Sequence, residues 1–188
     1  MRKIINSTYI SIDGVIEGPH LWPSLPKTGD DTGTRIQTDL LAACDAVLMG
    51  RRTYDVFAPA WQSRSGDPYS DRINTMQKYV VSSTLKDPDW PNTAVIDGDV
   101  VGEIRRLKEQ PGQDIVQYGF GQVSFALLEA GLLDELHLWV HPQFVGRGGP
   151  GDLLFRECTP TLLALRDTTT LKSGIVILSY DFDNAGGS

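Results

Sequence analysis

The stretch LMGRRTYDVF, residues 48–57, decides the fold that the sequence predicts. An apolar run ends at Gly50, two arginines and a threonine follow, and the apolar spacing of a helix then resumes. This pattern predicts a buried strand over 46–50 and a helix directly after it. Ligands of open α/β sheets bind beyond the carboxyl ends of the strands. The sequence therefore places Arg51 and Arg52 where a ligand would be expected.

The pattern along the rest of the chain predicts that strands and helices alternate first and that strands alone finish. Helices are predicted after Gly50, over 99–109, over 120–131, and from Thr34, where TRIQ has the form of a capping box with Gln37 reaching back. Strands are predicted over 3–12, 46–50, 78–84, 93–96, 114–119, 135–142, 162–171 and 174–182, with the last two joined by a turn at Lys172-Ser173. This order is typical of an α/β domain whose mostly parallel sheet ends in antiparallel strands. We expect a single domain over 1–183 and a flexible tail over 184–188.

Two regions are expected to be irregular. Residues 18–33 hold several prolines and glycines and form a long loop, and such loops in compact domains are often functional. The chain through Pro59, Trp61 and Pro68 is expected to lack regular structure as well.

The composition disfavours several classes of function. The chain has 188 residues, 40% of them hydrophobic, and a formal net charge of −7, which disfavours nucleic acid and anionic membranes because both recruit clustered Lys and Arg. The sequence shows no signal peptide and no apolar run of roughly 20 residues, the length of a membrane helix. Cys44 and Cys158 lack CxxC spacing, so a cytoplasmic, reduced protein is expected. His137 and His141 lie roughly 13 Å apart along a strand, too far to share a metal ion, and no metal is expected.

Three predicted strand ends carry residues that suit a phosphate. Gly50 lets the backbone turn sharply, and the arginines after it open a helix whose N–H groups suit an anion; solvated arginines on a surface turn are the alternative. The hydroxyls of Ser82, Ser83 and Thr84 could bind a phosphate or cap a turn. The glycine-rich turn YGFGQV, residues 118–123, suits a pyrophosphate, although tight packing also selects glycine. Together these features predict a nucleotide with several phosphates, and arginine beside hydroxyls indicates the 2′-phosphate of NADPH.

Four segments together carry a family resemblance: ISIDGVIEG, VLMGRRTYD, VVSST and YGFGQVSFALLEAGLLDELHLWVHPQFVGRGGPGDLLF. They resemble the dihydrofolate-reductase-like superfamily, and most of all the reductase domain of the riboflavin-biosynthesis deaminase-reductase. The resemblance covers residues 3 to about 180. It implies an α/β fold with a mixed, mostly parallel eight-stranded sheet flanked by helices, and NADPH as hydride donor.

The resemblance also implies roles for individual residues. The residues that would meet the adenosine-side phosphates are Gly50, Arg51, Arg52 and Thr53. Those that would lie near the 2′-phosphate are Ser82 and Ser83. Those that would wrap the pyrophosphate are Gly119, Phe120, Gly121, Gln122 and Val123. Those that would lie near the nicotinamide and the substrate are Tyr9, Asp13 and Ile16.

The substrate side has three candidate residues. Asp13 is the catalytic candidate because it could orient a substrate amino or hydroxyl group, and the alternative is a plain Asp-Gly turn. Trp22 could stack on a heterocycle or belong to the edge of the core. Arg147, in the loop VGRGGPG, could bind a substrate phosphate or be solvated.

The expected substrate class depends on sequence features of related enzymes that this chain lacks. Folate reductases carry a carboxylate at the start of the helix after the first loop, and Thr34 aligns there, although Asp30, Asp31 and Asp39 keep the question open. The chain also lacks the H-x-E and C-x-x-C sequences of zinc deaminases. We expect an NADPH-dependent reductase of a pyrimidine- or pterin-like molecule, in its most specific form a reductase of 5-amino-6-(5-phosphoribosylamino)uracil. The alternatives are a nucleotide-binding sensor without catalysis and a dihydrofolate reductase proper.

A homodimer is expected. The resemblance implies one, and the strand 135–142 carries His137, Trp139 and His141 on one face, an unusual set for full solvent exposure.

Overall fold

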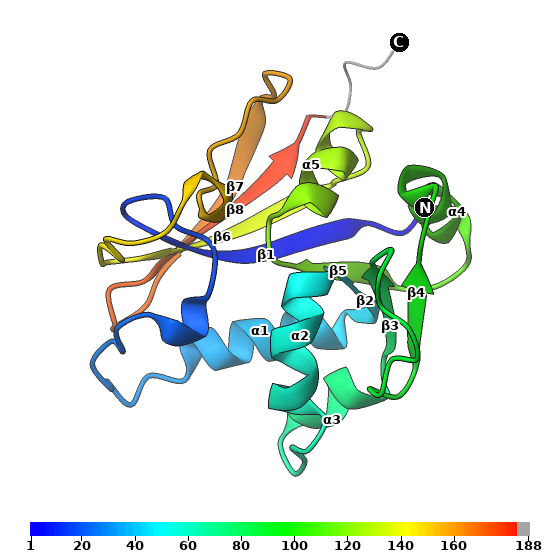
Figure 1. Cartoon of the computed structure of the whole chain (residues 1–188). Coiled ribbons are helices and arrows are strands. Elements are labelled where there is room, and N and C mark those ends of the chain that lie inside the picture. Colours follow the sequence, from blue (N-terminus) through cyan, green and yellow to red (C-terminus); the bar gives the residue numbers. More distant parts are fainter. Residues whose placement is uncertain (184–188) are drawn as a thin grey trace. The chain divides into compact units, whose positions relative to one another are not determined.

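Eight strands form one hydrogen-bonded sheet in the computed structural model, which describes residues 1–183 (Figure 1). The strand order is β4-β3-β2-β5-β1-β6-β8-β7. The strands are β1 (Ile4–Ser11), β2 (Cys44–Gly50), β3 (Gln77–Val81), β4 (Thr93–Ile96), β5 (Asp114–Tyr118), β6 (Glu135–His141), β7 (Leu163–Thr170) and β8 (Val176–Phe182). The helices are η1 (Pro19–Leu21), α1 (Thr32–Ala42), α2 (Arg51–Trp61), α3 (Pro68–Thr75), α4 (Val100–Glu109), α5 (Gln122–Glu129) and η2 (Pro150–Asp152). The predicted fold class is confirmed, and the predicted tail at 184–188 lies outside the described residues.

Contacts between residues divide the chain into two compact units. Unit 1 comprises Met1–Ile5 and Thr34–Tyr118, and unit 2 comprises Asn6–Gly33 and Gly119–Ser188. That the chain is a single domain stays a prediction.

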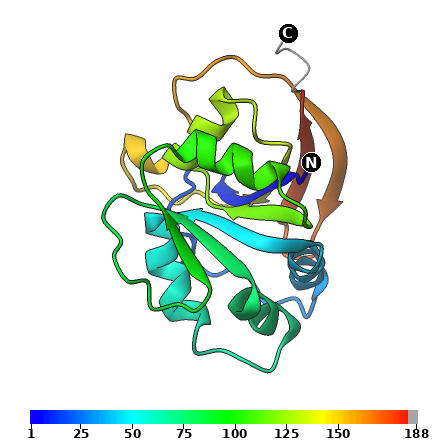
Figure 2. The ribbon, with the colours of Figure 1, turned by 90° about the vertical axis from the view of Figure 1, so that its right-hand side faces the viewer.

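Unit 1 contains the parallel strands. β2 pairs in parallel with β3 and β5, and β3 pairs in parallel with β4. Figure 2 shows α2 and α3 on one side of β2 and β3, with α4 on the other. Val47 and Met49 of β2 lie in a buried apolar cluster with Leu41 of α1 and Tyr54 of α2, because alternate residues of a strand point to the same face. Gly50 is the register partner of Val81, so β2 and β3 end at the same edge.

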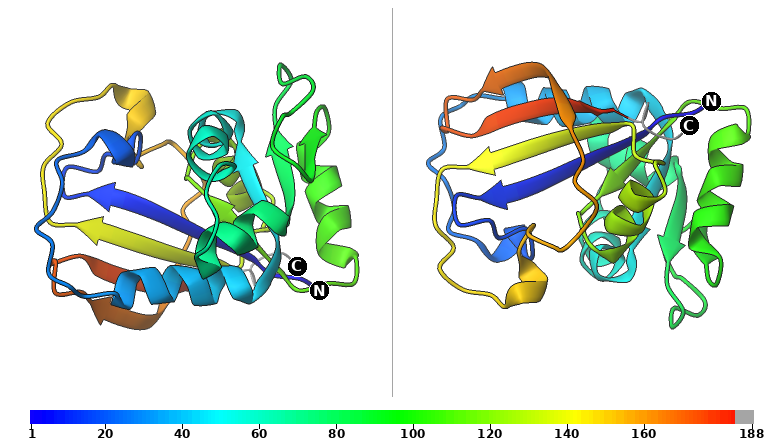
Figure 3. Two further views of the ribbon diagram at one scale, coloured as in Figure 1. Left: turned by 90° about the horizontal axis from the view of Figure 1, so that it is seen from below. Right: turned by 90° about the horizontal axis from the view of Figure 1, so that it is seen from above.

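Unit 2 contains the antiparallel strands. β8 pairs with β6 on one side and with β7 on the other, and Figure 3 shows β6, β8 and β7 in that order. The β7–β8 hairpin is closed by hydrogen bonds from Leu171 N to Ile175 O and from Gly174 N to Leu171 O. The predicted turn at Lys172-Ser173 is confirmed.

Helix α1 begins at Thr32, so the predicted capping box with Thr34 as N-cap is wrong. Asp30 Oδ1 accepts hydrogen bonds from Thr32 N at 3.1 Å and Thr32 Oγ1 at 2.6 Å. Asp30 Oδ2 accepts one from Lys172 N at 3.0 Å. This carboxylate holds the chain just before the helix, and Thr34 lies inside the first turn.

The stretch predicted to be irregular around Pro59 and Pro68 is largely helical. α2 continues through Pro59 to Trp61, and Pro68 opens α3. The Asp67 side chain accepts hydrogen bonds from the backbone N–H groups of Tyr69 and Ser70, the usual way an N-cap satisfies the first turn. No α-helix in the part of the chain that the structure describes is both long and apolar enough to span a membrane.

Candidate functional site

Arg51 lies at the carboxyl end of β2 and opens α2. Its Nε donates to Asp55 Oδ1 at 2.7 Å, and its Nη1 lies 3.5 Å from Thr84 Oγ1, at the outer limit of a hydrogen bond. Gly50 is the N-cap of α2, and its extended backbone has no side-chain cap among the described residues. A cation at a helix N-terminus is repelled by the positive end of the helix dipole. A bound anion would offset this repulsion at the N-terminus of α2.

The hydroxyl residues that follow β3, Ser82 to Thr84, differ in their surroundings. Ser82 is 8% exposed, and its Oγ accepts hydrogen bonds from Thr84 N at 3.2 Å and Leu85 N at 3.0 Å. Ser82 therefore caps the turn, one of the two uses expected for it. Ser83 is exposed. Thr84 is the hydroxyl beside Arg51. The sequence predicts it as one of three hydroxyls that could bind a phosphate, but the roles implied by the family resemblance name only Ser82 and Ser83.

The turn between β5 and α5 has the backbone of an anion site. Gly119 has φ of +78°, and its carbonyl accepts hydrogen bonds from Asn6 Nδ2 at 2.9 Å and Ser124 Oγ at 3.1 Å. Gly121 is the N-cap of α5 and has no side-chain cap within residues 1–183. A Cβ added at Gly121 would meet no described atom within 4 Å. The N–H groups that open α5 are therefore available to a ligand from that side.

Asp13 ties two loops of unit 2 together. Its Oδ1 accepts hydrogen bonds from Ser11 Oγ at 2.5 Å and Val145 N at 3.0 Å, and its Oδ2 accepts one from Gly146 N at 2.8 Å. These donors, Ser11 first, lower the pKa of the Asp13 carboxyl to about 2. Asp13 is therefore a carboxylate at neutral pH and is no proton donor there.

Trp22 and Arg147 each contact the loops of unit 2. Trp22 is 8% exposed, and its Nε1 donates to Glu17 O at 3.0 Å. Arg147 Nη2 donates to Leu21 O at 2.8 Å. Both side chains therefore stabilise the loop of residues 17–22 through these hydrogen bonds, in addition to any contact with a substrate.

An aromatic cluster lies beside these loops. The His141 ring lies 4.8 Å from the ring centre of Tyr9 and 5.4 Å from that of Trp22. Burial lowers the pKa of His141 to about 4, and its Nε2 has no hydrogen-bond partner in residues 1–183. Trp139 is 3% exposed and donates from Nε1 to Ser7 Oγ at 3.2 Å. Of the two uses expected for the face of His137, Trp139 and His141, packing inside the chain or contact with a second subunit, Trp139 has the first, because it is buried inside unit 2.

The start of α1 is closely packed in unit 2. A Cβ at Gly33 would lie 2.9 Å from Leu171 Cδ1 and 3.4 Å from Trp139 Cζ3. Asp30, two residues before the helix, is already engaged by Thr32 and Lys172, and these contacts, that of the Thr32 hydroxyl first, lower its pKa to about 2. Asp30 therefore already has a structural partner on each of its oxygens.

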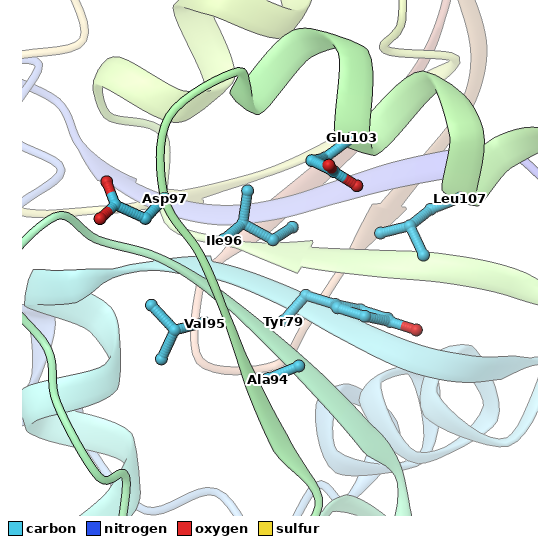
Figure 4. Close-up of a pocket in the computed structure, with 7 residues that line it drawn as sticks. All are labelled: Tyr79, Ala94, Val95, Ile96, Asp97, Glu103 and Leu107. Atoms are coloured by element: carbon cyan, nitrogen blue, oxygen red, sulfur yellow. The ribbon is translucent and has the colours of Figure 1, made fainter.

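A cavity of about 320 Å³ lies elsewhere in unit 1, where α4 faces β3 and β4 (Figure 4). Its lining residues are Tyr79, Ala94, Val95, Ile96, Asp97, Glu103 and Leu107. None of the predicted cofactor residues lines it. Two carboxylates and no cation line this cavity, so it does not suit the phosphates of a dinucleotide.

The described residues contain no group of three His, Cys, Asp or Glu side chains placed to hold a metal ion. His137 Nε2 instead lies 3.6 Å from Glu135 Oε2, and Arg166 also pairs with Glu135.

The fold agrees with the comparison of the chain with known proteins. The chain belongs to the RibD C-terminal domain family, whose model matches residues 2–177. Members of this family are generally NADPH-dependent oxidoreductases.

Individual relatives extend this finding. The uncharacterized protein YyaP of Bacillus subtilis is 30% identical over 189 residues, which cover 97% of this chain and 96% of YyaP. A pyrimidine reductase-like protein from Corynebacterium diphtheriae has the same fold, with a TM-score of 0.71 at 15% identity over 96% of this chain and 92% of that one. A diaminohydroxyphosphoribosylaminopyrimidine deaminase/5-amino-6-(5-phosphoribosylamino)uracil reductase from Thermotoga maritima matches with a TM-score of 0.66 at 15% identity, over 96% of this chain and 56% of that one.

Proposed function

We propose that this chain is an NADPH-dependent reductase of a pyrimidine-like small molecule, in its most specific form 5-amino-6-(5-phosphoribosylamino)uracil. The observation that carries the proposal is the Arg51 guanidinium beside the Thr84 hydroxyl, at the edge where β2 and β3 end. A guanidinium with a neighbouring hydroxyl suits a phosphate monoester, because arginine offers a fork of charge-assisted donors. Because members of this family are generally NADPH-dependent, we assign this phosphate to the 2′-phosphate of NADPH.

Each unit carries its own set of proposed binding residues. In unit 1, Gly50, Arg51, Arg52, Thr53 and Ser83 bind the phosphates on the adenosine side, and Ser82 shapes the turn that presents Ser83 and Thr84. In unit 2, the turn of Gly119, Phe120, Gly121, Gln122 and Val123 binds the pyrophosphate through backbone N–H groups. The residues proposed near the nicotinamide and the substrate are Tyr9, Asp13, Ile16, Trp22 and Arg147.

Cofactor choice is the first test. NADPH should bind about tenfold or more tightly than NADH, because a charge-assisted hydrogen bond contributes about 1.5–3 kcal/mol. Quenching of tryptophan fluorescence during titration with each cofactor gives the two dissociation constants. Arg51→Gln should remove most of the preference, because it should weaken NADPH binding more than NADH binding. Equal affinities of the unmodified chain for both cofactors would contradict the 2′-phosphate assignment.

Measuring NADPH oxidation with different acceptors distinguishes the reductase from a sensor and from a dihydrofolate reductase. NADPH oxidation driven by a ribosylaminouracil phosphate supports the reductase, and tight NADPH binding without turnover on any acceptor supports a sensor of the same fold. Dihydrofolate should drive negligible oxidation and methotrexate should bind weakly. A buried pterin would leave ring donors unpaired at a cost of about 1–3 kcal/mol each, and Asp30 is already engaged at the helix start. Robust turnover of dihydrofolate that is lost on replacing Asp30, Asp31 or Asp39 would contradict this assignment.

We further propose that the chain forms a homodimer and acts in the cytoplasm, as expected for this family.

A further inference from the structure

Arg51 and Asp55 form an ion pair one helical turn apart on α2. The Nε to Oδ1 distance is 2.7 Å, and the two side chains are 41% and 51% exposed. The order of the charges is unusual for a stabilising pair. An acidic residue followed by a basic one at i, i+4 supports a helix better than the reverse, and here the cation occupies the first helical position. Helix stability therefore does not explain why the pair has this order.

The geometry of the guanidinium gives a better explanation. Arginine has donors on Nε and on both Nη atoms, all in one rigid plane. Asp55 engages the Nε donor, and this contact fixes the plane so that Nη1 points to Thr84 Oγ1 at the end of β3. The 3.5 Å contact with Thr84 is long, so a phosphate oxygen can replace or join it.

We propose that Asp55 is a positioning residue that sets the preference of this site for NADPH over NADH, by holding Arg51 in the orientation that receives the 2′-phosphate. The inference rests on the proposed function. In this role Asp55 touches no cofactor atom and acts through Arg51 alone.

The opposing physical effect is repulsion between the Asp55 carboxylate and the phosphate. Both groups are anions near the same guanidinium, so removing the carboxylate charge would strengthen NADPH binding if repulsion dominated. Water and salt screen both the repulsion and the attraction within the ion pair because both side chains are exposed. The attraction acts across a direct 2.7 Å contact, and the repulsion acts across the guanidinium, so the repulsion is screened more. The two effects predict changes of opposite sign and can be separated.

The test uses the full chain and measures dissociation constants for NADPH and NADH, together with Tm. Asp55→Ala should lower the NADPH-to-NADH preference by about three- to tenfold, the expected effect of leaving one long side chain unordered, and should leave NADH affinity unchanged. Asp55→Asn, whose Oδ1 still accepts from Nε, should keep the preference within about twofold of the original. In an Arg51→Gln background, Asp55→Ala should have no further effect on the preference.

Glu103→Ala is the matched control, because it removes another exposed intrahelical ion pair, with Arg106 on α4, and should change Tm alone. The proposal is overturned if both Asp55 variants raise NADPH affinity, which would show repulsion. It is also overturned if Asp55→Ala changes Tm but not the preference, as a plain surface ion pair would. A chain that shows no NADPH preference before any substitution would instead contradict the proposed function itself.

Discussion

At the scale of single residues, Gly121 offers a direct test of the pyrophosphate turn. Gly121→Val should abolish NADPH binding with the fold retained. The backbone φ of −114° is open to any residue and a Cβ there meets no described atom, so the branched side chain would occupy only the space proposed for the pyrophosphate. Thermal unfolding should stay close to that of the original chain, and a cofactor titration would show the loss. Normal NADPH affinity in this variant would mean that the turn serves packing alone.

His141 should make the protein labile to mild acid. Its folded pKa of about 4 lies below the ordinary value of 6.5, so the unfolded chain binds more protons between these pH values and stability falls as the pH drops from 6.5 toward 4. After discounting for partial exposure, the loss is about 1–2 kcal/mol. His141→Phe, which keeps a ring between Tyr9 and Trp22, should reduce this loss in urea unfolding at pH 7 and pH 4.5. His20→Gln, at an exposed position, is the control and should leave the pH profile unchanged.

At the scale of elements, Lys78 joins β3 to the end of α3. It is fully buried, and its Nζ donates to the carbonyls of Ile73 at 3.0 Å, Asn74 at 3.2 Å and Met76 at 2.6 Å. Lys78→Met should lower the free energy of unfolding by about 2–3 kcal/mol, because carbonyls at a helix end lose their donor. Urea denaturation measures the change. Lys86→Met, at an exposed site, should leave the free energy of unfolding nearly unchanged. A comparable loss in this variant would show that the effect of Lys78→Met does not come from the unpaired carbonyls.

The elements also show what the sequence pattern could and could not predict. Strand β4 matches its predicted bounds, because β-branched runs between turn residues are a local signal. Helix α3 was missed because it buries little besides Ser70 and Ile73 and depends on Asp67 at one end and Lys78 at the other. Lys78 follows the helix in the sequence and contacts its last carbonyls only in the folded chain. The spacing of apolar residues along the sequence cannot predict such a contact.

Part of the candidate site could likewise be predicted from the sequence, and part could not. Gly50, Arg51 and the glycine turn lie at strand ends as predicted, because the order of strands and helices is encoded locally. The proximity of Thr84 to Arg51 depends on the pairing of β2 with β3, which brings together residues 33 positions apart in the sequence. The burial of Trp139 likewise depends on tertiary contacts. The capping use of Ser82 is by contrast local, since it involves backbone N–H groups two and three residues further along the chain, and it is one of the two uses expected for this hydroxyl.

At the scale of the whole molecule, β7 is the surface where we expect a second copy to bind. The strand is last in the sheet order, and Leu162, Leu163 and Leu165 at its start are 81%, 39% and 57% exposed. Exposed apolar edge strands invite pairing with another chain. Leu165→Glu should convert a dimeric mass to a monomeric one in light scattering, whereas Gln110→Glu, a new charge at an exposed site of unit 1, should not. A monomeric mass for the original chain would contradict the expectation.

The loop tether made by Asp13 has a consequence for exchange with solvent. The amide protons of Val145 and Gly146 point at a carboxylate that loses its charge near pH 2, although the loop around them lies at the surface. Those two amides should therefore exchange with deuterium more slowly than their exposed neighbours, and the protection should persist into acid until the carboxylate takes up its proton. Slow amides in an exposed glycine-rich segment would mark the loop as an ordered part of the molecule.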